Sequence, residues 1–453
     1  MIAQTLSGVE MGWSAPQLIL AHGIGSRGTL PLPLWQFSWA AVAALVLSFA
    51  GLGALWKSPK LSANTQGRAI PGSSVLVKAG TGVARVVGMG IFLLTTAAAL
   101  FGTDIGGESI NLAPVTIYVM LWVAIPVGAA LFGDIWKALN PFNTIGLLFP
   151  EGDEDAAPNH QWVAVALMFG FLFLELAHPS GDSPRILGWS IVVYSAVMIG
   201  GMARYGRVWL DRADGFGIAF TLIAAISPLY VDENKDLAFR LPLSGLSTVT
   251  VRPGTMLLIL TILGGTSFDG FSESPIYTDL IGRPNGWNAV PALTIGLIAM
   301  ILVAAIVYWT GSRATAKVTG VSQDDAANMF APSLVPIVWA YAVAHYAQLL
   351  VDQSQSFLFR LSNPFGNFNA QGEPTTDFFG NAAGVVDLNL INVDLVSWIQ
   401  ALSIVGGHVL AVLYAHDLAI TRFEHRRAVK SQQTMLFVMV LYSVAGLWLL
   451  FSA

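Results

Sequence analysis

The sequence predicts an all-α integral membrane protein with about ten transmembrane helices. Of its 453 residues, 55% are hydrophobic and only 11% are charged, whereas a soluble domain carries about 25% charged residues. The mean hydropathy is +0.65. Ten mostly apolar stretches of roughly 16–25 residues alternate with short polar loops, and each is long enough, or nearly so, to cross ~30 Å of hydrocarbon. No polar stretch is long enough for a separate globular unit, so we expect one membrane domain over residues 1–453.

The expected transmembrane helices follow one another along the whole chain. They cover residues 34–56, 86–102, 114–133, 162–178, 186–203, 255–271, 289–311, 333–351, 396–420 and 434–452. One further apolar segment, residues 215–230, does not fit this series. A full crossing there would place Lys235, Arg240 and Arg252 outside and invert every later loop, so we expect a re-entrant or interfacial helix. A chain of eleven spans is the alternative.

The distribution of basic residues predicts that both termini lie outside. If the first span runs inward, all but four of the 22 Lys and Arg residues lie in inner loops; the exceptions are Arg27, Arg185, Arg283 and Arg360. The opposite orientation would break the positive-inside rule in almost every loop. Residues 1–33 then form an outer extension, and residues 352–395 form a long outer loop rich in Asn, Gly and Phe.

The outer extension contains a weak resemblance to the end of a signal peptide just before His22. A basic n-region is missing, so we expect the extension to remain uncleaved. Cleavage at this point is the alternative, and it would make His22 an N-terminal residue able to chelate copper through its amine and imidazole.

Charge and composition exclude several classes of function. The predicted outer loops contain far more acidic than basic residues, so the outer face attracts cations and repels anions. No basic patch is available for a nucleic acid. The expected partner is the lipid bilayer, with a second membrane subunit as a further candidate. The chain has no Cys, which excludes disulfides, thiolate metal ligands and Cys nucleophiles. Motifs of serine hydrolases, zinc peptidases, P-loop proteins and dinucleotide-binding proteins are absent from the sequence.

Three spans contain ionisable residues at membrane depth, where such residues are costly and often functional. Glu175 and His178 are spaced i, i+3 on the fourth span, as in the Glu-x-x-His pairs of di-iron bundles. His345 lies on the eighth span, about 9 Å below its outer end, and His408 lies about 18 Å down the ninth span. A neutral His that is hydrogen-bonded between helices is the common alternative to a functional role.

The sixth span ends in the most unusual local sequence of the chain. Gly264 and Gly265 are expected to weaken the helix, and polar residues that include Asp269 and Glu273 follow at the outer membrane edge. This pattern predicts a cation or water site at a frayed helix end, with an ordinary capped terminus as the alternative.

Together these residues predict a possible divalent metal site of unknown identity. His345, His408, His178, Asp269 and Glu273 are the candidate ligands, and Glu175, Asp269 and Glu273 are the candidate catalytic carboxylates. A bound metal ion could lower the pKa of water and supply hydroxide.

Several motifs resemble those of a family of polytopic bacterial membrane proteins commonly labelled fenitrothion hydrolase. They are Ala21-His-Gly-Ile-Gly25, Leu30-Pro-Leu-Pro-Leu-Trp35, Asn111-Leu-Ala-Pro114, Gly133-Asp-Ile-Trp-Lys-Ala-Leu-Asn-Pro141, Leu241-Pro-Leu-Ser-Gly245, Phe268-Asp-Gly270, Gly407-His-Val-Leu410 and Ala415-His-Asp417. The resemblance implies a multi-pass protein of the bacterial cytoplasmic membrane that hydrolyses a neutral organophosphate ester.

Three functions therefore stay open at the level of sequence. The first is metal-assisted hydrolysis of a lipophilic phosphotriester in the outer half of the bundle, and its lead comes from the resemblance. The second is a transporter or channel for a metal cation or protons, which would use the same residues as a relay. The third is a scaffold subunit of a membrane complex, in which the polar residues only pair helices.

Overall fold

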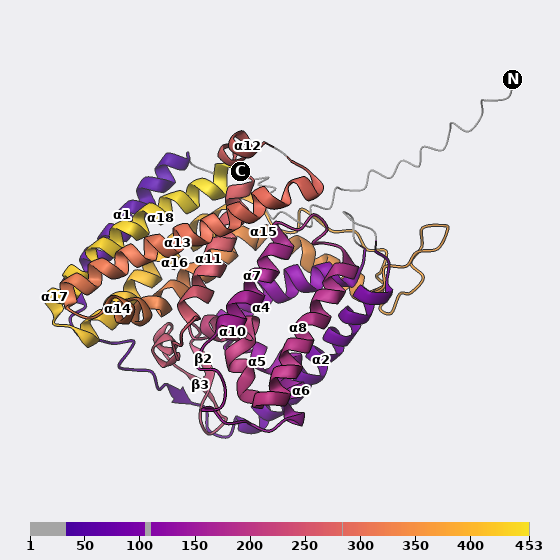
Figure 1. The fold of residues 1–453 in the computed structure, drawn as a ribbon, viewed down its shortest axis with the longest axis horizontal. Helices are drawn as coiled ribbons and strands as arrows, with labels where there is room; N and C mark the ends of the chain where they lie inside the picture. The colour runs from indigo at the N-terminus through magenta and orange to yellow at the C-terminus, as the bar shows by residue number, and fades with distance from the viewer. Residues whose placement is uncertain (1–32, 105–109, 283, 453) are drawn as a thin grey trace.

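The computed structural model describes residues 33–104, 110–282 and 284–452, and it confirms an all-α multi-pass membrane protein (Figure 1). Within these ranges, nine helical segments are long and apolar enough to cross a bilayer. They are formed by α1 (Leu34–Leu55), α2 (Ser74–Phe101), the continuous run of α3 (Leu112–Pro114), η1 (Val115–Ala124) and α4 (Ile125–Phe132), α8 (Pro184–Tyr205), α11 (Thr255–Ser272), α13 (Val290–Thr319), α15 (Val335–Ser362), α16 (Val393–Arg422) and α18 (Gln433–Ser452). His22 and the predicted outer extension up to residue 32 lie outside the described residues.

Short elements connect these helices. They are α5 (Trp136–Leu139), α6 (Pro141–Ile145), η2 (Gly146–Leu148), α7 (Trp162–Leu176), η3 (Arg207–Trp209), α9 (Leu210–Ala213), α10 (Gly215–Ala224), η4 (Ser244–Thr248), α12 (Pro275–Ile281), η5 (Gly286–Asn288), α14 (Gln323–Phe330), η6 (Ala331–Leu334) and α17 (His425–Ser431). Three short strands form one antiparallel sheet in the order β1 (Arg68–Ala69), β3 (Leu237–Phe239), β2 (Leu229–Val231), with Ala238 opposite both Ala69 and Tyr230.

The predicted fourth span is shorter than a bilayer crossing. Helix α7 has 15 residues, or about 22 Å at 1.5 Å per residue, and it ends three residues before Pro179. It packs between α10 and α11 in the interior of the molecule. Because protein surrounds it, its backbone ends need not reach both membrane surfaces.

Two predicted boundaries are wrong because helices continue past the apolar stretches. Helix α2 begins at Ser74, twelve residues before the predicted start, and includes Lys78 and Arg85. Helix α15 continues past Asp352 to Ser362, so the long outer loop covers residues 363–392 rather than 352–395. Polar residues in these extensions are compatible with a helix that leaves the hydrocarbon layer.

The apolar segment at 215–230 forms a short enclosed helix instead of a helix over its whole length. Helix α10 ends at Ala224, and β2 begins at Leu229, directly after Pro228. Asp214 caps the N-terminus, where its carboxylate accepts a hydrogen bond from the Gly217 N–H at 2.9 Å. The side chain of Phe220 is completely buried, and α4, α7 and α5 surround the helix. An apolar helix that does not cross the membrane is thus covered by protein.

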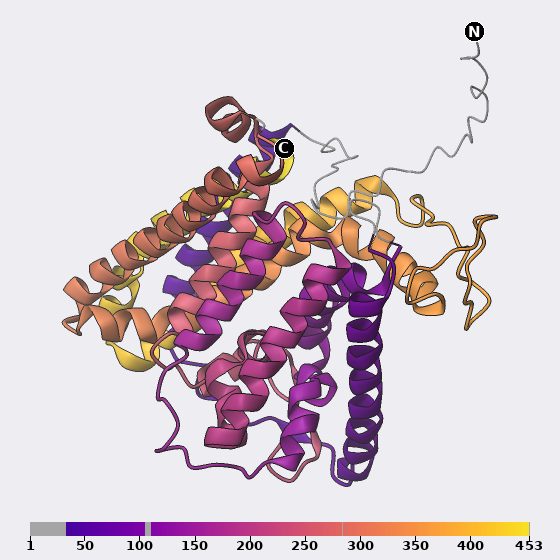
Figure 2. The same ribbon diagram turned by 45° about the vertical axis from the view of Figure 1, so that its right-hand side comes forward.

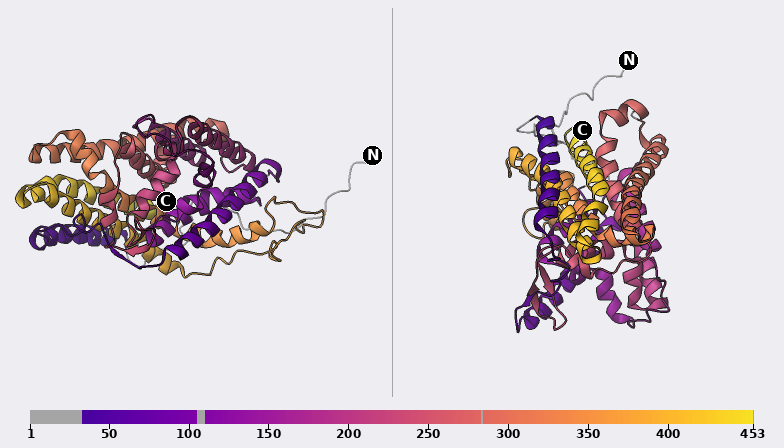
Figure 3. Two further views of the ribbon diagram at one scale, coloured as in Figure 1. Left: turned by 90° about the horizontal axis from the view of Figure 1, so that it is seen from below. Right: turned by 90° about the vertical axis from the view of Figure 1, so that its left-hand side faces the viewer.

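The helices form two groups that meet in the middle of the molecule. Helices α1, α13 and α18 slant together on one side, and α18 lies between the other two (Figures 1 and 3). Helices α2 and α8 stand together on the opposite side (Figure 2). Helices α11 and α15 connect the groups, since α11 packs on both α13 and α7, and α15 packs on both α16 and η1.

We expected the two glycines of the sixth span to weaken its helix. In the structure they instead allow the helix to pack closely against its neighbours. Helix α11 is continuous from Thr255 to Ser272. A Cβ atom on Gly264 would lie 2.5 Å from Cα of Ile301 on α13, and one on Gly265 would lie 2.6 Å from a methyl carbon of Leu172 on α7. Small residues allow such close backbone contact in membrane proteins. The prediction of a frayed end at this position is therefore wrong.

Candidate functional site

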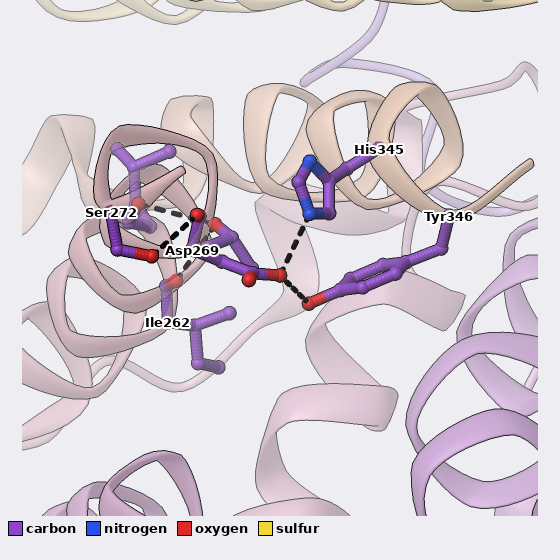
Figure 4. A network of polar contacts seen from close by, with 7 residues as sticks. Ile262, Asp269, Ser272, His345 and Tyr346 are labelled. Carbon is purple, nitrogen blue, oxygen red and sulfur yellow. Dashed lines mark hydrogen bonds and ion pairs between the residues drawn. The ribbon is translucent and has the colours of Figure 1, made fainter. Parts of the chain in front are cut away.

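The predicted ionisable residues include one pair that is in direct contact, Asp269 and His345 (Figure 4). Nε2 of His345 lies 2.7 Å from Oδ2 of Asp269, and the Tyr346 hydroxyl donates to the same oxygen at 2.8 Å. Asp269 is 2% exposed and His345 is 1% exposed. Asp269 comes from α11, and His345 and Tyr346 are neighbours on α15. We call these three residues the buried polar site.

The local packing around His345 fixes the orientation of its ring. Tyr341, one turn earlier on α15, stacks on the imidazole with ring centroids 6.0 Å apart, and the Tyr346 ring meets it edge-on at 4.6 Å. A Cβ atom on Gly270 would lie 3.1 Å from the Tyr341 hydroxyl and 3.9 Å from Cε1 of His345. The glycine after Asp269 thus gives the two rings room to approach α11.

Glu175 brings a second carboxylate to the buried polar site from α7. It is close enough to Asp269 and to Tyr346 for their charges to interact. Its Oε2 atom is buried and has no hydrogen-bond partner in the part of the chain that the structure describes. Nδ1 of His345 is likewise buried and has no hydrogen-bond partner among the described residues. Two carboxylates and one imidazole therefore lie close together in apolar surroundings. Oε2 of Glu175 and Nδ1 of His345 are not hydrogen-bonded to any described protein group.

More polar groups continue from the buried polar site toward α16 and α18. The hydroxyls of Ser267 and Tyr442 are 2.7 Å apart, and the rings of Tyr442 and His408 have centroids 6.3 Å apart. Nδ1–H of His408 donates to the Ile404 carbonyl of its own helix at 2.8 Å. These groups extend the polar region across the bundle, from α7 through α11 to α16 and α18.

The other predicted site residues lie elsewhere. Glu273 is exposed at the C-cap of α11. Nδ1 of His178 accepts a hydrogen bond from the Ser180 N–H at 3.2 Å, and its ring packs against Trp287. Farther along α15, Gln348 donates to both oxygens of Asp352 at 2.9 Å, so this carboxylate is paired within its own helix.

The described residues contain no group of three or more His, Asp or Glu side chains placed to hold a metal ion. Asp269 and His345 alone fall short of the three or four protein ligands of a typical zinc site. The metal site therefore stays a prediction.

Asp417, on α16, is completely buried. Its carboxylate accepts hydrogen bonds from the Trp56 indole at 2.8 Å and from the backbone N–H groups of Lys60, Leu61 and Ser62 at 2.6–3.1 Å. The residue therefore anchors the segment after α1 to α16, which is a structural role.

A cavity of about 770 Å³ lies on the opposite face of α7 from α11. Gly170, Phe171 and Leu174 of α7 line it, whereas Leu172 of the same helix contacts Gly265 of α11. Helices α2, α4, α8 and η1 provide most of the remaining wall. The cavity and the buried polar site are thus separate features on two sides of one helix.

Comparison with known proteins gives no relative for this chain. No protein-family model matches it, and no curated protein and no solved structure matches it.

Proposed function

We propose that this protein transfers protons within the bilayer and that the Asp269–His345 pair is the exchange site. The observation that carries the proposal is the 2.7 Å contact between Nε2 of His345 and Oδ2 of Asp269 at almost complete burial. Ionisable residues at such a depth are costly and are typical of ion and proton pathways.

The chemistry of the pair supports proton exchange. A contact of 2.7 Å between these atoms requires one proton between them. A second proton can be added at Nδ1 of His345, where no protein group in the described residues competes for it. The pair can therefore exist in two protonation states without moving its heavy atoms.

Glu175 gives the exchange site a neighbour that can pass a proton on. Two carboxylates in apolar surroundings repel each other when both are ionised. When one carboxylate takes up a proton, the other can therefore release its own more easily. The hydroxyls of Tyr346, Ser267 and Tyr442 supply further donors and acceptors at hydrogen-bond distance from their neighbours. Such groups are suited to a relay across the bundle.

Hydrolysis of a lipophilic organophosphate ester is the second candidate function. The family resemblance implies it, and the cavity of about 770 Å³ falls in the ~300–1,000 Å³ range of ligand pockets. However, α7 separates the cavity from Asp269 and His345. The contacts therefore favour proton transfer. We place the protein in the bacterial cytoplasmic membrane, as the resemblance implies, and a partner subunit remains part of the scaffold alternative.

Proton flux into proteoliposomes tests the proposal. The purified protein is reconstituted with a trapped pH-sensitive dye, and a potassium diffusion potential drives proton entry. Asp269→Asn is the test variant. Asp134→Asn is the matched control, since Asp134 is a carboxylate that also accepts a hydrogen bond from a hydroxyl, that of Thr221, but follows the end of α4 and lies outside the buried polar site.

We expect wild-type and control protein to acidify the vesicles several times faster than protein-free vesicles, and Asp269→Asn to lose this excess. Equal rates for wild-type protein and Asp269→Asn contradict the proposal, as do rates no higher than those of empty vesicles. A parallel assay of nitrophenol release from a nitrophenyl phosphotriester examines the hydrolase alternative separately.

A further inference from the structure

The cavity beside α7 has the location of a binding site for a molecule from the bilayer. Its wall is almost entirely apolar and includes Ile91, Ile117, Leu121, Phe171 and Leu187. The lining residues extend from Ala166 to Leu174 on α7, from Ile186 to Tyr194 on α8 and from Thr116 to Ile125 on η1 and α4. Each of these stretches is about 12 Å long. The cavity is thus elongated along the helices, as a hydrocarbon chain in a bilayer is.

The cavity is open on the side of α8. Trp189 and Val193 line it and are 60% and 59% exposed, which in a membrane means exposure to lipid. Ala166 and Gly170, on the enclosed helix α7, are also exposed, because they face the cavity. A Cβ atom added to Gly170 would meet no heavy atom within 4 Å.

Two residues of the wall, Thr95 and Trp136, have a buried polar atom without a hydrogen-bond partner in the described part of the chain. Thr95 on α2 is 2% exposed, and its hydroxyl has no hydrogen-bond partner in the described part of the chain. It lies six residues from the end of α2 at Phe101, or about 9 Å along the helix. A buried hydroxyl without a partner is costly, and an oxygen of a bound molecule would relieve that cost.

The other end of the cavity contains a carboxylate, Asp214, whose hydrogen bonds are already satisfied. Asp214 accepts hydrogen bonds from the hydroxyl of Tyr194 and the side-chain amide of Asn140, each at 2.7 Å, and from Gly217 N–H. Asp214 therefore needs no hydrogen bond from a ligand. An apolar chain end can lie against the rings of Tyr194 and Phe216.

We infer that this cavity binds a long hydrocarbon chain, with an ester or carboxyl oxygen of the bound molecule accepting a hydrogen bond from Thr95. The chain belongs to a membrane phospholipid or to a free fatty acid, which share this chemistry. The inference does not depend on proton transfer at Asp269, because α7 separates the two sites.

Photo-crosslinking tests the inference in the full-length protein. The protein is reconstituted in phosphatidylcholine vesicles that contain either a phosphatidylcholine with a diazirine on its acyl chain or a free fatty acid with the same group. After illumination, mass spectrometry of peptides locates the labelled residues. Gly170→Leu fills the cavity, and Gly200→Leu on α8 is the matched control, because a Cβ atom at Gly200 also meets nothing within 4 Å but that residue does not line the cavity.

We expect labelling concentrated on the cavity faces of α7, α8 and η1, reduced at least fivefold in Gly170→Leu and unchanged in Gly200→Leu. Thr95→Val should reduce it by a smaller factor. The probe that labels the cavity identifies the source of the chain. Labelling spread evenly over lipid-facing helices such as α1 and α13 overturns the inference, as does cavity labelling that Gly170→Leu leaves unchanged.

Discussion

The imidazole of His345 and the carboxylate of Asp269 are 76 positions apart in the sequence and 2.7 Å apart in the structure. Their contact joins α11 to α15 in the interior of the bundle, next to the packing of α11 on α7. Helix association in a bilayer depends on close packing and on interhelical hydrogen bonds. The pair therefore contributes to the fold as well as to the proposed exchange of protons.

Replacement of His345 should reveal the coupling between these two side chains. His345→Ala leaves the Asp269 carboxylate without its imidazole partner and should cost about 3–5 kcal/mol. Asp269→Asn removes the charge, so the double variant should be less destabilised than the sum of the two single variants. Thermal unfolding of all four proteins in the same detergent measures this difference. Additive effects would show that the two side chains are not coupled.

The close contact of α11 with α13 predicts a strong effect of a single methyl group. In Gly264→Ala, the added Cβ atom would meet the backbone of Ile301 at 2.5 Å, so the helices must separate at a cost of about 1–3 kcal/mol. Gly90→Ala on α2 is the control, because its Cβ atom meets nothing within 4 Å. The melting temperature should fall for Gly264→Ala alone; an equal response of both variants would contradict the packing described here.

Acid should loosen the outer loop at Asp377. The Ser362 hydroxyl, and then the backbone N–H groups of residues 380–382, lower the pKa of Asp377 below its usual value. A lowered folded-state pKa stabilises the loop above the unfolded pKa of about 3.9, and this stabilisation is lost as the pH falls through the folded-state pKa.

The matching measurement is the rate of proteolysis in residues 377–382. At pH 7, chymotrypsin should cleave Asp377→Asn faster than wild-type protein after the exposed residues Phe378 and Phe379. Under pepsin, once the pH has fallen below the folded-state pKa of Asp377, the two proteins should become equally sensitive. A wild-type loop that stays more resistant than the variant in strong acid would refute this role of the carboxylate.

The orientation in the membrane can be tested with introduced thiols because the natural chain has no Cys. Gln371→Cys in the predicted outer loop should react with an impermeant maleimide in intact cells. Asp153→Cys, in the predicted inner loop, should react only after permeabilisation. Both positions are exposed, so accessibility to solvent does not distinguish them. The reverse pattern would mean that the basic residues do not set the topology.

The sequence was sufficient for the class of fold because hydrophobic length and composition act locally. Helix ends were predicted poorly, since the helical hydrogen bonds of α2 continue through Lys78 and those of α15 continue past Asp352. Gly264 was misinterpreted because a glycine that breaks a helix and one that lets another helix approach look identical in one sequence. Only the position of Ile301 on the neighbouring helix decides between them.

The candidate site was predicted in part. Asp269, His345 and Glu175 were recognisable singly because each is ionisable and lies in an apolar stretch. No local pattern indicated which helices bring them together. Tyr346 was not predicted, because tyrosines are common both in cores and at membrane interfaces. Tyr346 follows His345 directly, so its side chain leaves the helix about 100° away from that of His345. Both side chains nevertheless reach the same oxygen of Asp269.

Infrared spectroscopy of the protein in lipid tests most directly whether the Asp269–His345 pair exchanges a proton. Spectra are recorded between about pH 4 and pH 10, a range that spans the ordinary titration of carboxyl and imidazole groups. We predict a pH-dependent change in the carboxyl and imidazole bands that disappears in Asp269→Asn and persists in Asp134→Asn. An identical pH dependence in wild-type protein and Asp269→Asn would contradict the assignment of this pair as the exchange site.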